Sequence, residues 1–193
     1  MESADLLDEC PEVSRLALAS AGRNRDLWLA ALALDGRIGR MVLGASEPML
    51  GQIRLAWWRD QLAKPVSQRP RGDLLLDLIG QEWEGGEHAL RALVDGWEAL
   101  LSPRPLADAA VTQFVDGRGQ VSLGLAYRTG QAGAAVQTER AGKLWALADL
   151  ANHAEADSER ERTLELSEEV GTERIRLPRE LRPLAVLGGL ARR

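Results

Sequence analysis

Three residues in the last third of the sequence could bind a metal ion or transfer a proton. Asp149, His153 and Asp157 follow one another at intervals of four residues, in a segment that the sequence predicts as one helix, Glu139–Asp157. Residues at this spacing lie on one face of a helix. Carboxylate and imidazole groups are common metal ligands, and histidine is the usual general base near neutral pH. The alternative is an exposed helix face with a local Asp–His pair.

The geometry of one straight helix argues against a metal site at these residues. Asp149 and Asp157 would lie about 12 Å apart along the helix at a rise of about 1.5 Å per residue. Ligands bind a metal at about 2 Å, so all three side chains cannot close on one ion. We therefore expect no tight divalent site and assign no catalytic residue.

A second group of polar residues is placed among apolar ones, in the stretch Asp26–Lys64. The second helix predicted there carries Arg54 and Gln61 in the middle of a broad apolar arc. The arc consists of Leu50, Ile53, Leu55, Trp57, Trp58 and Leu62. An unpaired buried guanidinium costs several kcal/mol, so we expect Arg54 to be buried beside a carboxylate. Asp35 in the preceding helix is the nearest candidate, whereas Arg59, nearly opposite Arg54, is expected on the surface.

Two interpretations of this pair stay open. The functional one is a polar cleft between the two helices. The structural one is a buried ion pair with no chemistry, in which Arg54 extends partly along Trp58. Elsewhere the sequence has no Ser/His/Asp set, no Cys/His set, no P-loop and no Rossmann glycine pattern.

The elements that would position these residues are predicted to be helices. Apolar residues at helical spacing predict two helices in Asp26–Lys64, joined by a turn at Ala45–Pro48. Further helices are expected at Ala4–Glu9, Glu12–Ala21 (a helix or a turn), Asp73–Gly80 or on to Trp83, Glu87–Leu101, Leu106–Thr129 with a kink at Gly117 and Gly119, Glu139–Glu155, Thr163–Val170 and Arg182–Arg193. Loops or breaks are expected at Pro65–Gly72, Ser102–Pro105, Gly130–Gly133 and Asp157–Arg162. We predict an all-α single domain over residues 1–193.

Composition and charge narrow the classes of partner. The 193 residues are 45% apolar and 27% charged, as in ordinary globular proteins. The formal net charge of −5 gives no basic surplus for nucleic acid. The single cysteine, Cys10, excludes an internal disulfide and suits a reducing compartment. The longest apolar run, Leu27–Leu34, is far shorter than the roughly 20 residues of a membrane-spanning helix. We expect no transmembrane segment and a cytoplasmic location, peripheral to the inner membrane if the chain touches a membrane.

Two segments resemble a known family. ALALDGRIGRMVLGASEPMLGQIRLAWWRDQL (Ala31–Leu62) resembles the N-terminal region of squalene/phytoene synthase-like proteins, and is most specific over Glu47–Arg59. RLPRELRPLAVLGGLARR (Arg176–Arg193) resembles the C-terminal segment of the short proteobacterial branch. That branch is also similar to the mitochondrial complex I assembly factor built on this fold. The resemblance implies an isoprenoid-synthase-like helical bundle around a central cleft, here truncated.

This chain departs from the family at the positions that bind metal. Active members carry two aspartate-rich helices whose carboxylates hold Mg²⁺, which in turn holds the diphosphate leaving group. Residues 39–43, where the first motif is expected, contain no aspartate, and Asp35 lies one turn earlier. In the second motif His153 stands where the family has Asp, and Asp157 is a remnant. One or two carboxylates cannot assemble the usual metal cluster.

Three functional hypotheses follow. The first is a non-catalytic family member that binds an isoprenoid or other lipid, a membrane surface or a protein partner, as in respiratory-complex assembly. The second is a prenyltransferase that binds diphosphate through arginines, and only this alternative would involve Mg²⁺ as a cofactor. The third is a structural subunit that docks a helical protein, which an exposed apolar patch around Trp57 or Trp83 would favour. The expected cleft residues are Asp35, Arg37, Arg40, Arg54, Trp58, Gln61, Asp149, His153 and Asp157.

Overall fold

The chain folds into packed α-helices. The computed structural model describes residues 6–154, 156–171 and 175–191, and within them there is no β-strand, which confirms the predicted all-α class. The helices are α2 (Glu12–Leu18), α3 (Arg25–Leu43), α4 (Pro48–Ala63), α5 (Leu74–Glu82), α6 (Glu87–Ala99), α7 (Asp108–Arg128), α8 (Ala135–Asn152), α9 (Asp157–Val170) and α10 (Arg182–Leu190). The predicted starts and ends at Ala4 and Arg193 lie outside the described residues. None of the described helices is long and apolar enough to cross a bilayer.

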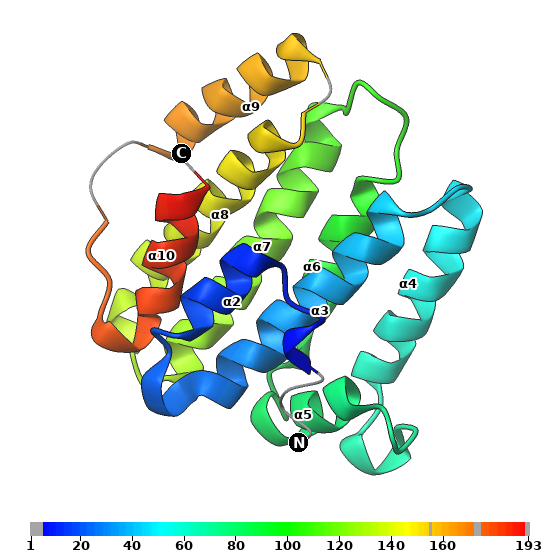
Figure 1. The fold of residues 1–193 in the computed structure, drawn as a ribbon, viewed down its shortest axis with the longest axis vertical. Coiled ribbons are helices and arrows are strands. Elements are labelled where there is room, and N and C mark those ends of the chain that lie inside the picture. Colours follow the sequence, from blue (N-terminus) through cyan, green and yellow to red (C-terminus); the bar gives the residue numbers. More distant parts are fainter. Residues whose placement is uncertain (1–5, 155, 172–174, 192–193) are drawn as a thin grey trace.

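The longer helices run side by side through the body of the molecule. Figure 1 shows α4 and α9 at opposite edges, with α3, α6, α7 and α8 between them and α2 and α10 packed together over one face. The turns between them contain the expected breakers, since Gly72, Gly85 and Gly130 have positive φ angles. Helices α2 and α10 bring together the two ends of the described chain.

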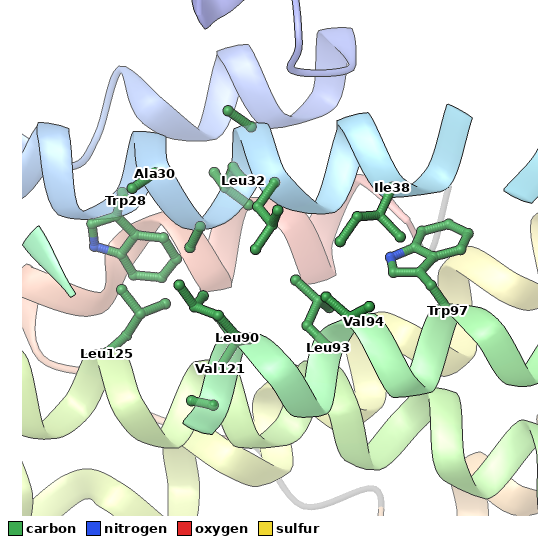
Figure 2. Packing of buried hydrophobic residues seen from close by; sticks show 14 of the residues in the cluster. Trp28, Ala30, Leu32, Ile38, Leu90, Leu93, Val94, Trp97, Val121 and Leu125 are labelled. Atoms are coloured by element: carbon green, nitrogen blue, oxygen red, sulfur yellow. The ribbon is translucent and has the colours of Figure 1, made fainter. Parts of the chain in front are cut away.

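Helix α3 is the central element, and it is buried nearly all round. Its side chains meet α6 and α7 on one side, where Trp28, Leu32 and Ile38 face apolar residues of both helices (Figure 2). Two indole N–H groups also secure it. Trp83 Nε1 donates to the carbonyl of Leu27 at 3.1 Å, and Trp28 Nε1 donates to the carbonyl of Glu180 at 3.2 Å.

Three predictions of where a helix begins, ends or is interrupted differ from the structure. Helix α7 continues through Gly117 and Gly119, because these glycines let α6 and α8 approach closely: an added methyl group would lie 2.6 Å from the Ala92 carbonyl oxygen or 2.9 Å from the Lys143 side chain. Helix α8 begins at Ala135 and stops at Asn152. Helix α9 includes the charged stretch expected as a loop, and its first turn places Asp157 at the positive end of the helix dipole.

The N-terminal segment crosses α3 at Gly36. A methyl group on Gly36 would overlap the carbonyl oxygen of Glu9, and it would lie 2.8 Å from the Pro11 ring. The segment can therefore approach α3 only because this residue has no side chain. The Glu9 carboxylate is held on the far side of the crossing by Arg37 and Arg40.

We predict that Gly36→Ala destabilises the fold by about 1–3 kcal/mol, because the crossing segment must shift to accommodate the methyl group. Gly188→Ala is the matched control. Gly188 is also helical but has open space around its Cα, so alanine there should be neutral or stabilise by about 0.5–1 kcal/mol. Urea unfolding followed by circular dichroism measures both, and equal effects of the two substitutions would contradict the close crossing.

Candidate functional site

A buried arginine joins three helices at the centre of the bundle. Arg118 of α7 is only 3% exposed. Its Nε and Nη2 donate to the two carboxylate oxygens of Asp35 in α3, at 3.1 and 2.9 Å. Its Nη1 donates to Oδ2 of Asp149 in α8, at 2.6 Å. All three guanidinium nitrogens therefore donate to carboxylates, which come from two other helices.

Aromatic rings enclose this ion pair. The guanidinium carbon of Arg118 lies 4.1 Å from the ring centre of Trp145, 4.8 Å from that of Phe114 and 5.3 Å from that of Trp97. Such contacts stabilise a cation by attraction to the ring faces. Trp97 Nε1 also donates to Oδ1 of Asp35 at 2.7 Å, so both oxygens of that carboxylate accept hydrogen bonds.

The electrostatics of the cluster keep Arg118 charged. Burial by itself lowers the pKa of Arg118, but attraction by Asp35 and Asp149 and the hydrogen bonds to both raise the pKa overall above its ordinary value. One cation and two carboxylates leave one negative charge in excess. This excess charge is best hydrated on the Asp149 carboxylate, because the side chain of Asp149 is 27% exposed and that of Asp35 is 7% exposed.

A small cleft of about 190 Å³ lies next to this cluster. Asp149 and His153 line it together with Arg104 and apolar side chains, namely Val42, Leu43, Trp97, Leu100, Phe114 and Leu150. His153 Nδ1 lies 2.7 Å from the carbonyl oxygen of Asp149 and donates to it, since a carbonyl can only accept. Arg104 is paired with Glu159 at 2.6 Å.

The interior behind the cluster is filled. Between Trp28, Arg118 and Trp145 the free space amounts to about 10 Å³, which is about the volume needed to hold a single water molecule. No isoprenoid chain fits there. The interior at this depth is therefore occupied by side chains of this protein.

The carboxylates do not fit a Mg²⁺ site. Magnesium requires several oxygen ligands in a near-octahedral arrangement. Both oxygens of Asp35 and one of Asp149 are instead taken by the permanently charged Arg118. In the described ranges no three His, Cys, Asp or Glu side chains are grouped closely enough to hold a metal ion.

The expected face formed by Asp149, His153 and Asp157 does not exist. Helix α8 ends before His153, residue Ala156 is extended, and Asp157 is the first residue of α9. The prediction of one continuous helix is wrong, because the chain leaves the helix without a proline or glycine to mark the break. Asp149 and His153 form the local pair that was the alternative, with Nδ1 and Oδ1 3.7 Å apart.

The expected burial of Arg54 is also wrong. Arg54 is exposed and has no ion pair with any residue that the structure describes, whereas Arg59 pairs with Asp95 at 3.0 Å and Glu98 at 2.6 Å on α6. Apolar residues occur on both sides of α4, so the sequence pattern leaves open which side faces the core. The structure buries the side that contains Gly51, Leu55, Trp58, Gln61 and Leu62.

The remaining candidate residues serve the packing of α3. Arg37 binds Glu9 at 2.7 Å and Asp73 at 2.8 Å, and its guanidinium lies 5.5 Å from the ring centre of buried Trp58. Arg40 binds both the carboxylate and the carbonyl oxygen of Glu9. Gln61 is buried and accepts from Lys64 Nζ at 3.1 Å.

The residue that holds the site together, Arg118, is not among the residues singled out from the sequence. The signal is present, since Arg118 follows Phe114 and Val115 and precedes Val121 at the spacing of the apolar face of α7. A charged residue on that face requires a buried carboxylate partner, and Asp35 is one such residue. The flanking Gly117 and Gly119 instead suggested a kink.

Comparisons of this chain with protein-family models, with curated proteins and with solved structures find no match. The interpretation of the site therefore depends on its own geometry and on the sequence resemblance.

Replacing Arg118 should strongly destabilise the folded state. We expect Arg118→Ala to cost about 3–5 kcal/mol in unfolding free energy, because it leaves the Asp35 carboxylate buried without a cation. Arg54→Ala removes an arginine that is exposed, so its effect should stay within about 0.5 kcal/mol. Chemical denaturation of the two variants gives both values. Similar, small losses would mean that the central ion pair does not support the fold.

Proposed function

We propose that this chain is a non-catalytic protein of the squalene/phytoene synthase type, on a truncated isoprenoid-synthase-like scaffold, that acts by docking a helical protein partner. An assembly-factor role would use such a scaffold. The observation that carries the proposal is the cluster of Arg118 with Asp35 and Asp149. An internal cation occupies the carboxylates nearest to the family's two metal motifs.

The same cluster argues against prenyl transfer. That reaction requires carboxylates that are free to hold Mg²⁺ and an apolar cavity for the hydrocarbon chains. Here both carboxylates are bound to Arg118, and about 10 Å³ remains free behind it. The alternative of diphosphate binding through Arg37, Arg40 and Arg54 is not supported either, since Arg37 and Arg40 are engaged by Glu9 and only Arg54 is exposed and unpaired within the described residues.

The docking surface we propose is the outer face of α4. Met49, Ile53 and Trp57 recur there at intervals of four residues and are 68%, 61% and 41% exposed, with Leu50 beside them. Apolar residues at this spacing form a ridge that packs into the groove of a second helix. The other tryptophan considered from the sequence, Trp83, is fully buried and cannot take part.

The charges around this ridge favour a protein partner over a membrane. Helices that lie on membranes are rich in Lys and Arg on their polar face. The exposed charged residues of α4 and its two ends have both signs: Arg54 and Lys64 are cationic, and Glu47 and Asp60 are anionic. A mixed rim of this kind suits the polar border of a protein interface.

The first test is catalytic. Incubated with farnesyl or geranylgeranyl diphosphate and Mg²⁺, the protein should release no diphosphate and form no condensed product, because its carboxylates are occupied by Arg118. Product analysis by mass spectrometry and a diphosphate-release assay measure this. Turnover that a chelator abolishes would refute the non-catalytic proposal.

The second test concerns the docking face. A photo-crosslinking residue at position 53 should form a defined adduct with one protein in the source cells, and the same residue at Val136 of α8, which is more exposed than Ile53, should not. The captured protein is then purified and titrated against the chain. Ile53→Glu should weaken that binding by about tenfold or more, whereas Val136→Glu should not. Adducts with lipid alone, or equal adducts at both positions, would exclude this role for α4.

A further inference from the structure

Three arginines line one polar cleft at the end of the molecule where α3 and α10 begin. The cleft has a volume of about 430 Å³. Its walls are the turn between α2 and α3 and the start of α10, and its charged lining residues are Arg23, Arg179, Arg182 and Glu180. The two walls are far apart in sequence and are brought together by the packing of α2 on α10.

These arginines have no counter-charge in contact among the described residues, and they share one cleft. Arg37, Arg59, Arg69, Arg118 and Arg162 all form ion pairs with carboxylates. Arg23, Arg179 and Arg182 form neither ion pairs nor side-chain hydrogen bonds with any residue in the described part of the chain. In a protein with a net charge of −5, three unpaired cations in one cleft are a local concentration of positive charge.

The surrounding groups do not cancel this charge. The lining residues together have a formal charge of +2, because Glu180 is their only carboxylate. Helices α3 and α10 both begin at this end, each with an arginine as its first residue, and their N-terminal dipoles add to the positive potential. The C-terminal end of the shorter α2 also reaches the cleft and offsets part of that contribution. Like charges in one cleft repel each other, and a bound anion would relieve that repulsion.

We propose that this cleft binds a phosphoryl group, as a free phosphate or as part of a larger phosphorylated molecule. A phosphate dianion matches the +2 charge of the lining, and its oxygens accept paired hydrogen bonds from the fork of a guanidinium. The volume is large enough for a phosphate with an attached organic group. This inference is independent of the docking face on α4 and of the question of catalysis.

Titration calorimetry of the full chain with inorganic phosphate and with pyrophosphate, at constant ionic strength, tests the proposal. Saturable binding of one anion per chain is expected. The double variant Arg179→Gln/Arg182→Gln should bind about tenfold more weakly or not at all, because both charged forks are lost. Arg54→Gln removes an exposed, unpaired arginine of α4 and should bind like the unmodified protein. Arg54, Arg179 and Arg182 are all exposed, so circular dichroism should show that both variants remain folded.

Vesicles distinguish the source of the phosphate. Phosphatidylcholine vesicles that contain phosphatidic acid present a phosphate monoester at a lipid surface. If these vesicles sediment the protein and the double variant stays in solution, the ligand is a lipid headgroup; if only the free anions bind, it is a soluble phosphate. Binding that Arg54→Gln weakens as much as the double variant does would overturn the proposal. So would the absence of saturable binding to the anions and the vesicles.

Discussion

The positive charge of Arg118 inside the bundle is the constraint on which the arrangement of α3, α7 and α8 depends. A guanidinium at this depth is tolerated only beside carboxylates with good geometry. Asp35 and Asp149 meet this requirement from two helices that are far apart in sequence. Sliding any of the three helices by one turn, about 5.4 Å, would separate the charges. The ion pair therefore fixes the register of the helices, while the apolar contacts around it supply most of the stability.

The surfaces available for binding lie at the periphery of the molecule, because its centre is filled by side chains. The cleft beside Asp149 is small, and the interior behind it is closed. Further out, the described residues present an apolar ridge on an edge helix, a cationic cleft at one end of the bundle and a cleft of about 590 Å³ between α8 and α9. Surfaces of this kind suit a protein that holds other molecules in place.

The sequence predicts the helices well and the contacts between them less well. Apolar periodicity is a local property, so the class and most of the helices could be inferred, α3 best of all. The orientation of α4 could not, because Leu50 and Ile53 on one side are as apolar as Leu55 and Leu62 on the other. Only the packing partner decides between them. The break after Asn152 lacks a proline or glycine, and the partner of Asp35 lies 83 residues away, beyond any local pattern.

The packing of α2 against α10 has a consequence for the order of folding during synthesis. Helix α2 leaves the ribosome long before α10, yet the apolar face of α2, with Ala17 and Leu18, is covered by α10. The bond between Trp28 and Glu180 likewise spans 152 residues. The first of these helices must therefore wait, with apolar surface exposed, until α10 has emerged. This interval is the time at which the nascent protein is most open to aggregation and to capture by chaperones.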